Sequence, residues 1–157
     1  MYPQINGIGQ VQQYIDQSEL PGPIGFYNLK KIDFTQLQVL LPGETNAPGT
    51  LTGKVGTPLP VSLGASGFIN VTVNAVDSTF HIIPGVTDII KLTSDDLTSF
   101  LPNNASLVNG TLTFGVTGNS QPLAFGSPGT WTITASDVSV FSSNILPTTS
   151  SPVSVTP

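Results

Sequence analysis

Cysteine and arginine are both absent from this chain of 157 residues, and basic residues are limited to four lysines. Without cysteine, the chain has neither disulfides nor thiolate metal ligands, so its stability must come from packing. Charged residues make up 8% of the sequence, far below the roughly 25% of an average soluble domain, and the formal net charge is −5. Nucleic acids and anionic membranes are bound by clusters of Lys and Arg. The composition therefore argues against both partners.

Long apolar runs are also missing. No stretch approaches the roughly 18 residues of a membrane span, so the sequence predicts no membrane insertion. The N-terminus, Met1–Asn6, has neither the basic region nor the apolar core of a secretory signal peptide. The length fits one domain, or one domain with an added arm.

Two segments, 68–77 and 129–137, have a central run that alternates between apolar and polar residues. This period of two is typical of a β-strand with one buried face and one wet face. The predicted buried residues are Ile69, Val71, Val73 and Ala75 in the first segment and Trp131, Ile133 and Ala135 in the second; Asn70, Thr72 and Asn74 face the other way. We therefore assign Trp131 to the core and not to a ligand platform.

Shorter alternating segments, separated by turns rich in Gly, Pro and Asn, run through the rest of residues 33–157. After residue 32 there is no helix long enough to connect parallel strands, which excludes α/β folds. The sequence predicts an all-β sandwich of about seven to nine strands. The expected segments are 36–41, 59–63, 68–77, 80–83, 88–94, 112–116, 129–137 and 153–155, with an irregular connection over 42–57 and a loop over 95–104.

Residues 1–32 lack this pattern. Residues 10–17 have the spacing of a two-turn helix, and the Pro-Gly-Pro-Ile-Gly segment at 21–25 breaks regular structure. We interpret 1–32 as an arm that docks on a partner; packing against its own domain stays an open alternative. The candidate partner-binding residues of the arm are Tyr2, Tyr14, Ile15, Phe26 and Tyr27.

Several segments of the chain resemble successive parts of bacterial immunoglobulin-like (Big-type) repeats. They are Asp33–Glu44, Phe68–Asp77, Leu92–Asp95, Ala105–Thr111, Gly129–Asp137 and Ser151–Thr156. The resemblance covers residues 33–157 and implies an immunoglobulin-like sandwich. Such repeats typically occur in tandem in surface adhesins, whereas this chain has one copy. Single domains with an added arm resemble those on phage virions, as capsid decorations or tail parts.

Catalysis is not predicted. His81 is the only histidine, so a site with two histidines is impossible. Asp77, Ser78 and Thr79 are near it in sequence, but successive strand residues point to opposite faces, which does not bring a nucleophile, base and acid together.

Asp77, Asp95 and Asp137 each follow a predicted strand. If those strands run in the same direction, the three carboxylates lie near one pole of the sandwich and could bind calcium. The alternative is that each aspartate caps a turn. No other cofactor is expected.

The sequence therefore predicts a non-enzymatic structural protein on a virion surface, anchored by its arm to neighbouring subunits or to copies of itself. Weak contact with cell-surface glycans is a further expectation. One alternative is an adhesin or extracellular filament module at a bacterial surface. A carbohydrate-binding module is another, and it requires an exposed aromatic row on one sheet.

Overall fold

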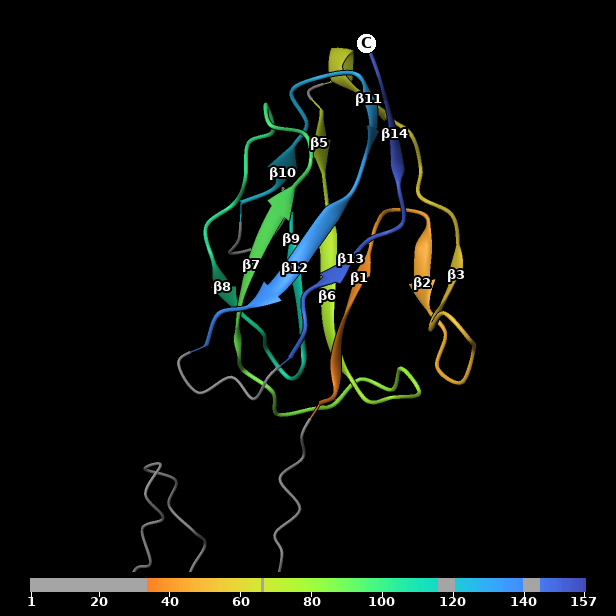
Figure 1. Ribbon diagram of the computed structural model, residues 1–157, viewed down its shortest axis with the longest axis vertical. Coiled ribbons are helices and arrows are strands. Elements are labelled where there is room, and N and C mark those ends of the chain that lie inside the picture. The colour runs from red at the N-terminus through yellow and green to blue at the C-terminus, as the bar shows by residue number, and fades with distance from the viewer. Residues whose placement is uncertain (1–33, 66, 116–120, 140–144) are drawn as a thin grey trace, which may run out of the picture. The chain divides into compact units, whose positions relative to one another are not determined.

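The computed structural model describes residues 34–65, 67–115, 121–139 and 145–157, which belong to one compact unit (Figure 1). These residues form strands and loops, with a single 3₁₀ turn at Leu63–Ala65. The predicted all-β class is confirmed. Within the described part of the chain, no helix has the length and hydropathy needed to span a membrane. The helix predicted over 10–17 lies outside the described residues.

The first sheet has the order β1 (Gln36–Leu40), β6 (Val71–Val76), β9 (Thr111–Phe114), and both pairings are antiparallel. One residue, Asn70, separates β6 from β5 (Phe68–Ile69), which pairs with β10 (Leu123–Ala124). The outer and inner faces of β6 therefore continue along β5.

The second sheet has the order β13 (Thr148–Thr149), β12 (Ile133–Asp137), β7 (Ile89–Ser94), β8 (Ala105–Ser106), again antiparallel. The chain of β12 is preceded by β11 (Gly129–Trp131), which pairs with β14 (Val153–Thr156). β14 also pairs with β4 (Val61–Ser62), and this pairing is parallel.

The two sheets pack face to face, with β12 over β1 (Figure 1). Their inner residues form one apolar core. It includes the predicted inward residues Ile69, Val71, Val73, Ala75, Ile133 and Ala135. Trp131 is partly buried against this core, and its indole Nε1 donates to the Ser127 carbonyl at 2.9 Å. Its assignment as a packing residue is thus confirmed, although the side chain is only partly buried.

A hairpin of β2 (Glu44–Asn46) and β3 (Lys54–Gly56) replaces the irregular connection expected over 42–57. Its polar residues carry no alternating apolar pattern, which is why the sequence did not predict it. It packs on the outer face of β1, where Gln38 Nε2 donates to the Gly53 carbonyl at 2.7 Å.

The strand predicted over 80–83 is reduced to a single bridge between Val76 and Ile82. Phe80 has a left-handed backbone (φ 68°), which a continuous strand cannot contain. Residues 77–81 form a turn instead. The loop expected over 95–104 includes a bridge from Phe100 to Ala124 of β10.

Within this unit, the first and last described residues lie at opposite ends. Phe34 precedes β1 at the lower end in Figure 1, and Pro157 follows β14 at the upper end.

Candidate functional site

The arm residues predicted to bind a partner, Tyr2, Tyr14, Ile15, Phe26 and Tyr27, lie outside the described residues. Their role stays a prediction.

The three aspartates predicted to share one pole do not. β7 and β12 are antiparallel neighbours in which Ser94 pairs with Ile133 and Ile90 pairs with Asp137. Asp95 therefore follows one end of this strand pair, and Asp137 lies at the other end. In the residues that the structure places, no three His, Asp or Glu side chains gather as metal ligands would. The expected convergence of Asp77, Asp95 and Asp137 at one pole is wrong, because strand direction could not be read from the sequence.

Each of the three carboxylates instead accepts hydrogen bonds at its own turn or strand end, which agrees with the alternative that these aspartates cap turns. Asp77 Oδ1 accepts from the backbone amides of Thr79 and His81 at 2.8 and 2.9 Å. The His81 amide and then the Thr79 hydroxyl are the main causes that lower the pKa of the Asp77 carboxyl. Asp95 accepts from the amide of Thr132 at 2.7 Å, and Asp137 from the amide of Ser139 at 2.9 Å.

The turn at 77–81 brings Asp77, Thr79 and His81 together, contrary to the expectation from strand alternation. His81 Nδ1 lies 2.9 Å from Thr79 Oγ1 and 3.4 Å from Asp77 Oδ2. In a catalytic triad, the nucleophile contacts one imidazole nitrogen and the acid contacts the other. Here both groups face Nδ1, so His81 cannot pass a proton from one to the other. The cluster stabilises the turn.

Asp96 is the most fully hydrogen-bonded carboxylate of the described residues. It is buried and accepts five hydrogen bonds. The donors are the amide and hydroxyl of Thr98 (3.0 and 2.6 Å), the amide of Gly126 (2.8 Å), and the amide and hydroxyl of Ser127 (3.2 and 2.9 Å). Burial raises the pKa of this carboxyl, but the donors outweigh burial and hold the pKa far below its ordinary value. Asp96 thus ties the loop after β7 to the loop after β10.

A polar row, buried at Gln38 and Asn74 and exposed at Thr111, crosses the outer face of the first sheet. Gln38, Asn74 and Thr111 are direct cross-strand neighbours on β1, β6 and β9. Asn74 Nδ2 donates to Gln38 Oε1 at 3.0 Å, and Thr111 Oγ1 donates to Asn74 Oδ1 at 2.7 Å. The sequence correctly assigned Asn74 to the outer face, but the side chain is buried there.

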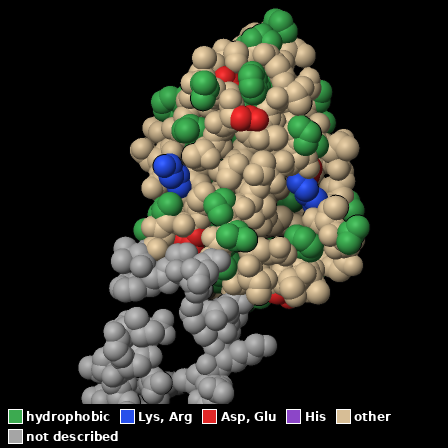
Figure 2. Space-filling view, in the orientation of Figure 1, with side chains coloured by type: hydrophobic (Ala, Val, Ile, Leu, Met, Phe, Trp, Pro, Cys, Tyr) green, Lys and Arg blue, Asp and Glu red, His purple; other side chains and the backbone are tan. Residues whose placement is uncertain are grey.

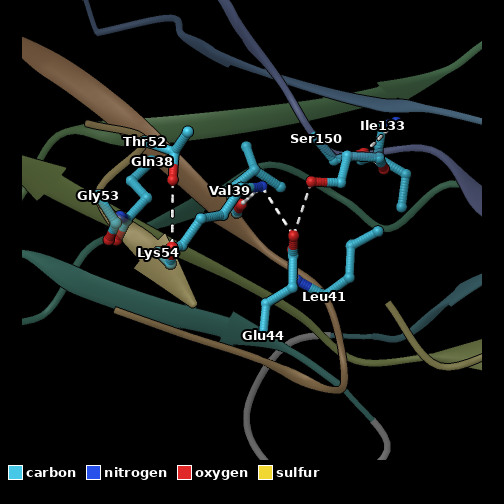
Figure 3. Close-up of polar contacts among 10 residues, drawn as sticks. Gln38, Val39, Leu41, Glu44, Thr52, Gly53, Lys54, Ile133 and Ser150 are labelled. Carbon is cyan, nitrogen blue, oxygen red and sulfur yellow. Dashed lines mark hydrogen bonds and ion pairs between the residues drawn. The ribbon is translucent and has the colours of Figure 1, made fainter. Parts of the chain in front are cut away.

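Glu44 and Lys54 fix that hairpin by an ion pair of 3.0 Å, and the Glu44 side chain is almost fully buried (Figure 3). The Glu44 carboxylate also accepts from the Leu41 amide at 3.0 Å and from the Ser151 hydroxyl at 2.7 Å. Burial alone raises the pKa of Glu44, but these donors and the Lys54 ammonium lower it below its ordinary value. The cluster is fully occupied by internal contacts and joins the hairpin to the C-terminal segment.

The outer face of β5 and β10 carries two exposed phenyl rings. Phe68 is 49% exposed and pairs with Ala124, which is bridged on its other side to Phe100, 55% exposed. The backbone groups of Phe100 and Ala124 exchange hydrogen bonds of 2.7 and 3.0 Å. Directly opposed residues of antiparallel strands project to the same face. The rings therefore flank the Ala124 methyl, while Ile69 and Leu123 on the opposite face are buried in the core.

This aromatic pair was missed by sequence reasoning. Phe68 has the same parity as Asn70 and Thr72, so the alternation itself places an aromatic ring on the wet face. Phe100 gave no such signal, because its neighbour Ala124 is distant in sequence. On the face shown in Figure 2, hydrophobic side chains are scattered among polar ones and few groups are charged. We take the Phe68–Ala124–Phe100 row as the candidate binding site.

Comparison with family models, with curated proteins and with solved structures gives no match to this chain. The resemblance to Big-type repeats therefore stays a prediction.

Proposed function

We propose that this chain is a non-enzymatic structural and interaction protein with an immunoglobulin-like sandwich fold. The sandwich stands on the surface of a larger assembly, and we propose that this assembly is a virion. The observation that carries the proposal is that Phe34 and Pro157 lie at opposite ends of the sandwich. An arm of residues 1–32 bound to a neighbouring subunit would hold the Phe34 end and leave the other end free.

The division of strands supports the immunoglobulin-like part of the proposal. β1, β6 and β9 lie in one sheet, and β7, β12 and β13 lie in the other. In immunoglobulin domains the first two strands and the fifth share one sheet in the same way, while the third, sixth and seventh share the other.

The chemistry of the carboxylates supports a structural role. Glu44 and Asp96 each accept several internal hydrogen bonds. Catalytic carboxylates keep an oxygen directed at substrate or at the base they orient. These two carboxylates instead hold the hairpin and the loops in place.

Removal of residues 1–32 tests the proposal. We expect residues 33–157 to keep the circular dichroism and amide spectrum of the sandwich but to be lost from the native assembly. A matched full-length variant with Tyr14, Phe26 and Tyr27 changed to Ala should also fail to incorporate. Normal incorporation of the truncated chain would contradict the docking arm.

The same end-to-end placement suits one unit of an adhesin or filament at a bacterial surface, where modules are joined in a string. Discovery of the chain at a cell surface, continuous with further repeats, would favour this alternative over the virion.

A further inference from the structure

We propose that the outer face around Phe68, Ala124 and Phe100 binds an uncharged oligosaccharide, with sugar rings stacked on the two phenyl rings. This inference goes beyond the structural role, and it does not depend on the arm or on the assembly in which the protein is found.

The spacing of the rings selects for a chain of sugars over a single sugar. Phe68 and Phe100 lie on either side of Ala124, so they are separated by two strand spacings, about 10 Å. The Ala124 side chain between the rings is a single methyl group. A ligand that contacts both rings must therefore extend beyond one sugar ring.

The polar groups beside the rings match the hydroxyl edges of a sugar. The same outer face continues from Phe68 to Asn70 and Thr72. Thr72 Oγ1 and Thr113 Oγ1 lie 2.9 Å apart at the surface. A sugar ring presents apolar C–H groups on its face and hydroxyls around its edge, so an aromatic surface next to hydroxyl side chains offers both kinds of contact.

The absence of charge on this face defines the ligand further. Its outward residues are Phe68, Asn70, Thr72, Thr113, Ala124 and Phe100, and none of them is ionisable. Such a face offers no ion pair to a sulfated or carboxylated glycan. It fits a neutral one.

The apolar area favours a sugar chain over a protein. Each ring is about half exposed, so the pair presents on the order of 200 Å² of aromatic surface. A stable protein interface buries about 800 Å² on each partner, with a continuous apolar centre. Two separated rings with a polar strip beside them are too small for that centre.

The experiment is an NMR titration of the full-length chain with neutral hexasaccharides: a β-1,4-glucan, an α-1,4-glucan and a β-1,4-linked N-acetylglucosamine oligomer, each added separately. We expect saturable chemical-shift changes at residues 68–72, 98–100, 113 and 123–124 with at least one of these glycans.

Phe68→Ala and Phe100→Ala should each weaken binding about tenfold or more. Phe100→Tyr should retain binding, because it keeps the ring.

Leu51→Ala is the matched control, because Leu51 is 97% exposed on the β2–β3 loop and outside this face; its affinity should be unchanged. Ala124→Lys keeps both rings but fills the space between them, so it should also lose binding if either Phe variant proves unstable. The proposal is overturned if none of the three glycans binds, or if binding survives all the substitutions. It is also overturned if the Phe variants instead abolish self-association measured by sedimentation, since the face is then a protein interface.

Discussion

At the scale of single residues, the neighbouring aspartates Asp95 and Asp96 differ in their surroundings. Asp96 is buried and accepts five hydrogen bonds, whereas Asp95 is exposed and accepts from the amide and hydroxyl of Thr132. Asp96→Asn places an NH₂ group against donors that need an acceptor. We expect a loss of about 2–3 kcal/mol in the free energy of unfolding, measured by urea titration. Asp95→Asn is the control and should lower the free energy of unfolding by less than about 1 kcal/mol. Equal losses for the two variants would mean that the burial of Asp96 does not contribute to stability.

The buried carboxylates of Asp96 and Glu44 make the stability of the protein sensitive to acid. Asp96 and Glu44 have lowered pKa values in the folded state, whereas the unfolded values are about 3.9 and 4.3. Because the folded state binds fewer protons, their stabilisation is complete above the unfolded pKa values and is lost as pH falls towards the folded ones. The urea midpoint should be flat between about pH 8 and 6 and should fall below about pH 4.5. Asp96→Asn should fall less steeply, and an unchanged slope would refute the assignment to Asp96.

At the scale of elements, substitution of two glycines in the β2–β3 hairpin distinguishes the energetic cost of backbone strain from that of a packing collision. Gly49 and Gly53 both have left-handed backbones (φ 79° and 70°). A Cβ added at Gly49 meets no neighbouring atom, whereas one at Gly53 collides with the Phe80 ring. Gly49→Ala should cost about 1–2 kcal/mol from the backbone alone. Gly53→Ala should cost about 1–3 kcal/mol more because of the collision.

The measurement is urea unfolding, with hydrogen exchange of the hairpin amides to locate the effect. A double variant, Gly53→Ala with Phe80→Ala, removes the ring, so its cost should be less than the sum of the two single costs. Strict additivity would contradict packing of Gly53 on Phe80.

Elements differed in how much of them the sequence could predict. Segments 68–77 and 129–137 were predicted because each buries one face, so apolar and polar residues alternate along it with a period of two. The β2–β3 hairpin was not, since its position depends on Gln38, Glu44 and Lys54 contacts across the fold. Strand direction also left no local signal, which is why Asp95 and Asp137 were grouped wrongly. Half of the candidate site, Phe68, was visible from its parity; Phe100 required the tertiary bridge to Ala124.

At the scale of the whole molecule, a chain with few charges and no cysteine relies on sheet pairing and on the core between the sheets. The last strand belongs to that framework. β14 pairs with β11 on one side and with β4 on the other, and its Val153 and Val155 are buried. The upper end of the sandwich is thus closed by the C-terminal residues.

Deletion of residues 152–157 should therefore unfold the whole sandwich. The loss of two buried valines costs about 1.5–3 kcal/mol each, before the two strand pairings are counted. The total approaches the 5–15 kcal/mol by which a domain is stable.

Deletion of the exposed Pro157 alone is the control. It removes one 3.3 Å hydrogen bond from Ser62 and should cost less than about 1 kcal/mol. Circular dichroism and amide spectra distinguish the outcomes, and a folded chain ending at Ser151 would mean that β14 is dispensable. A reporter fused after Pro157 leaves β14 intact, so it should keep the fold.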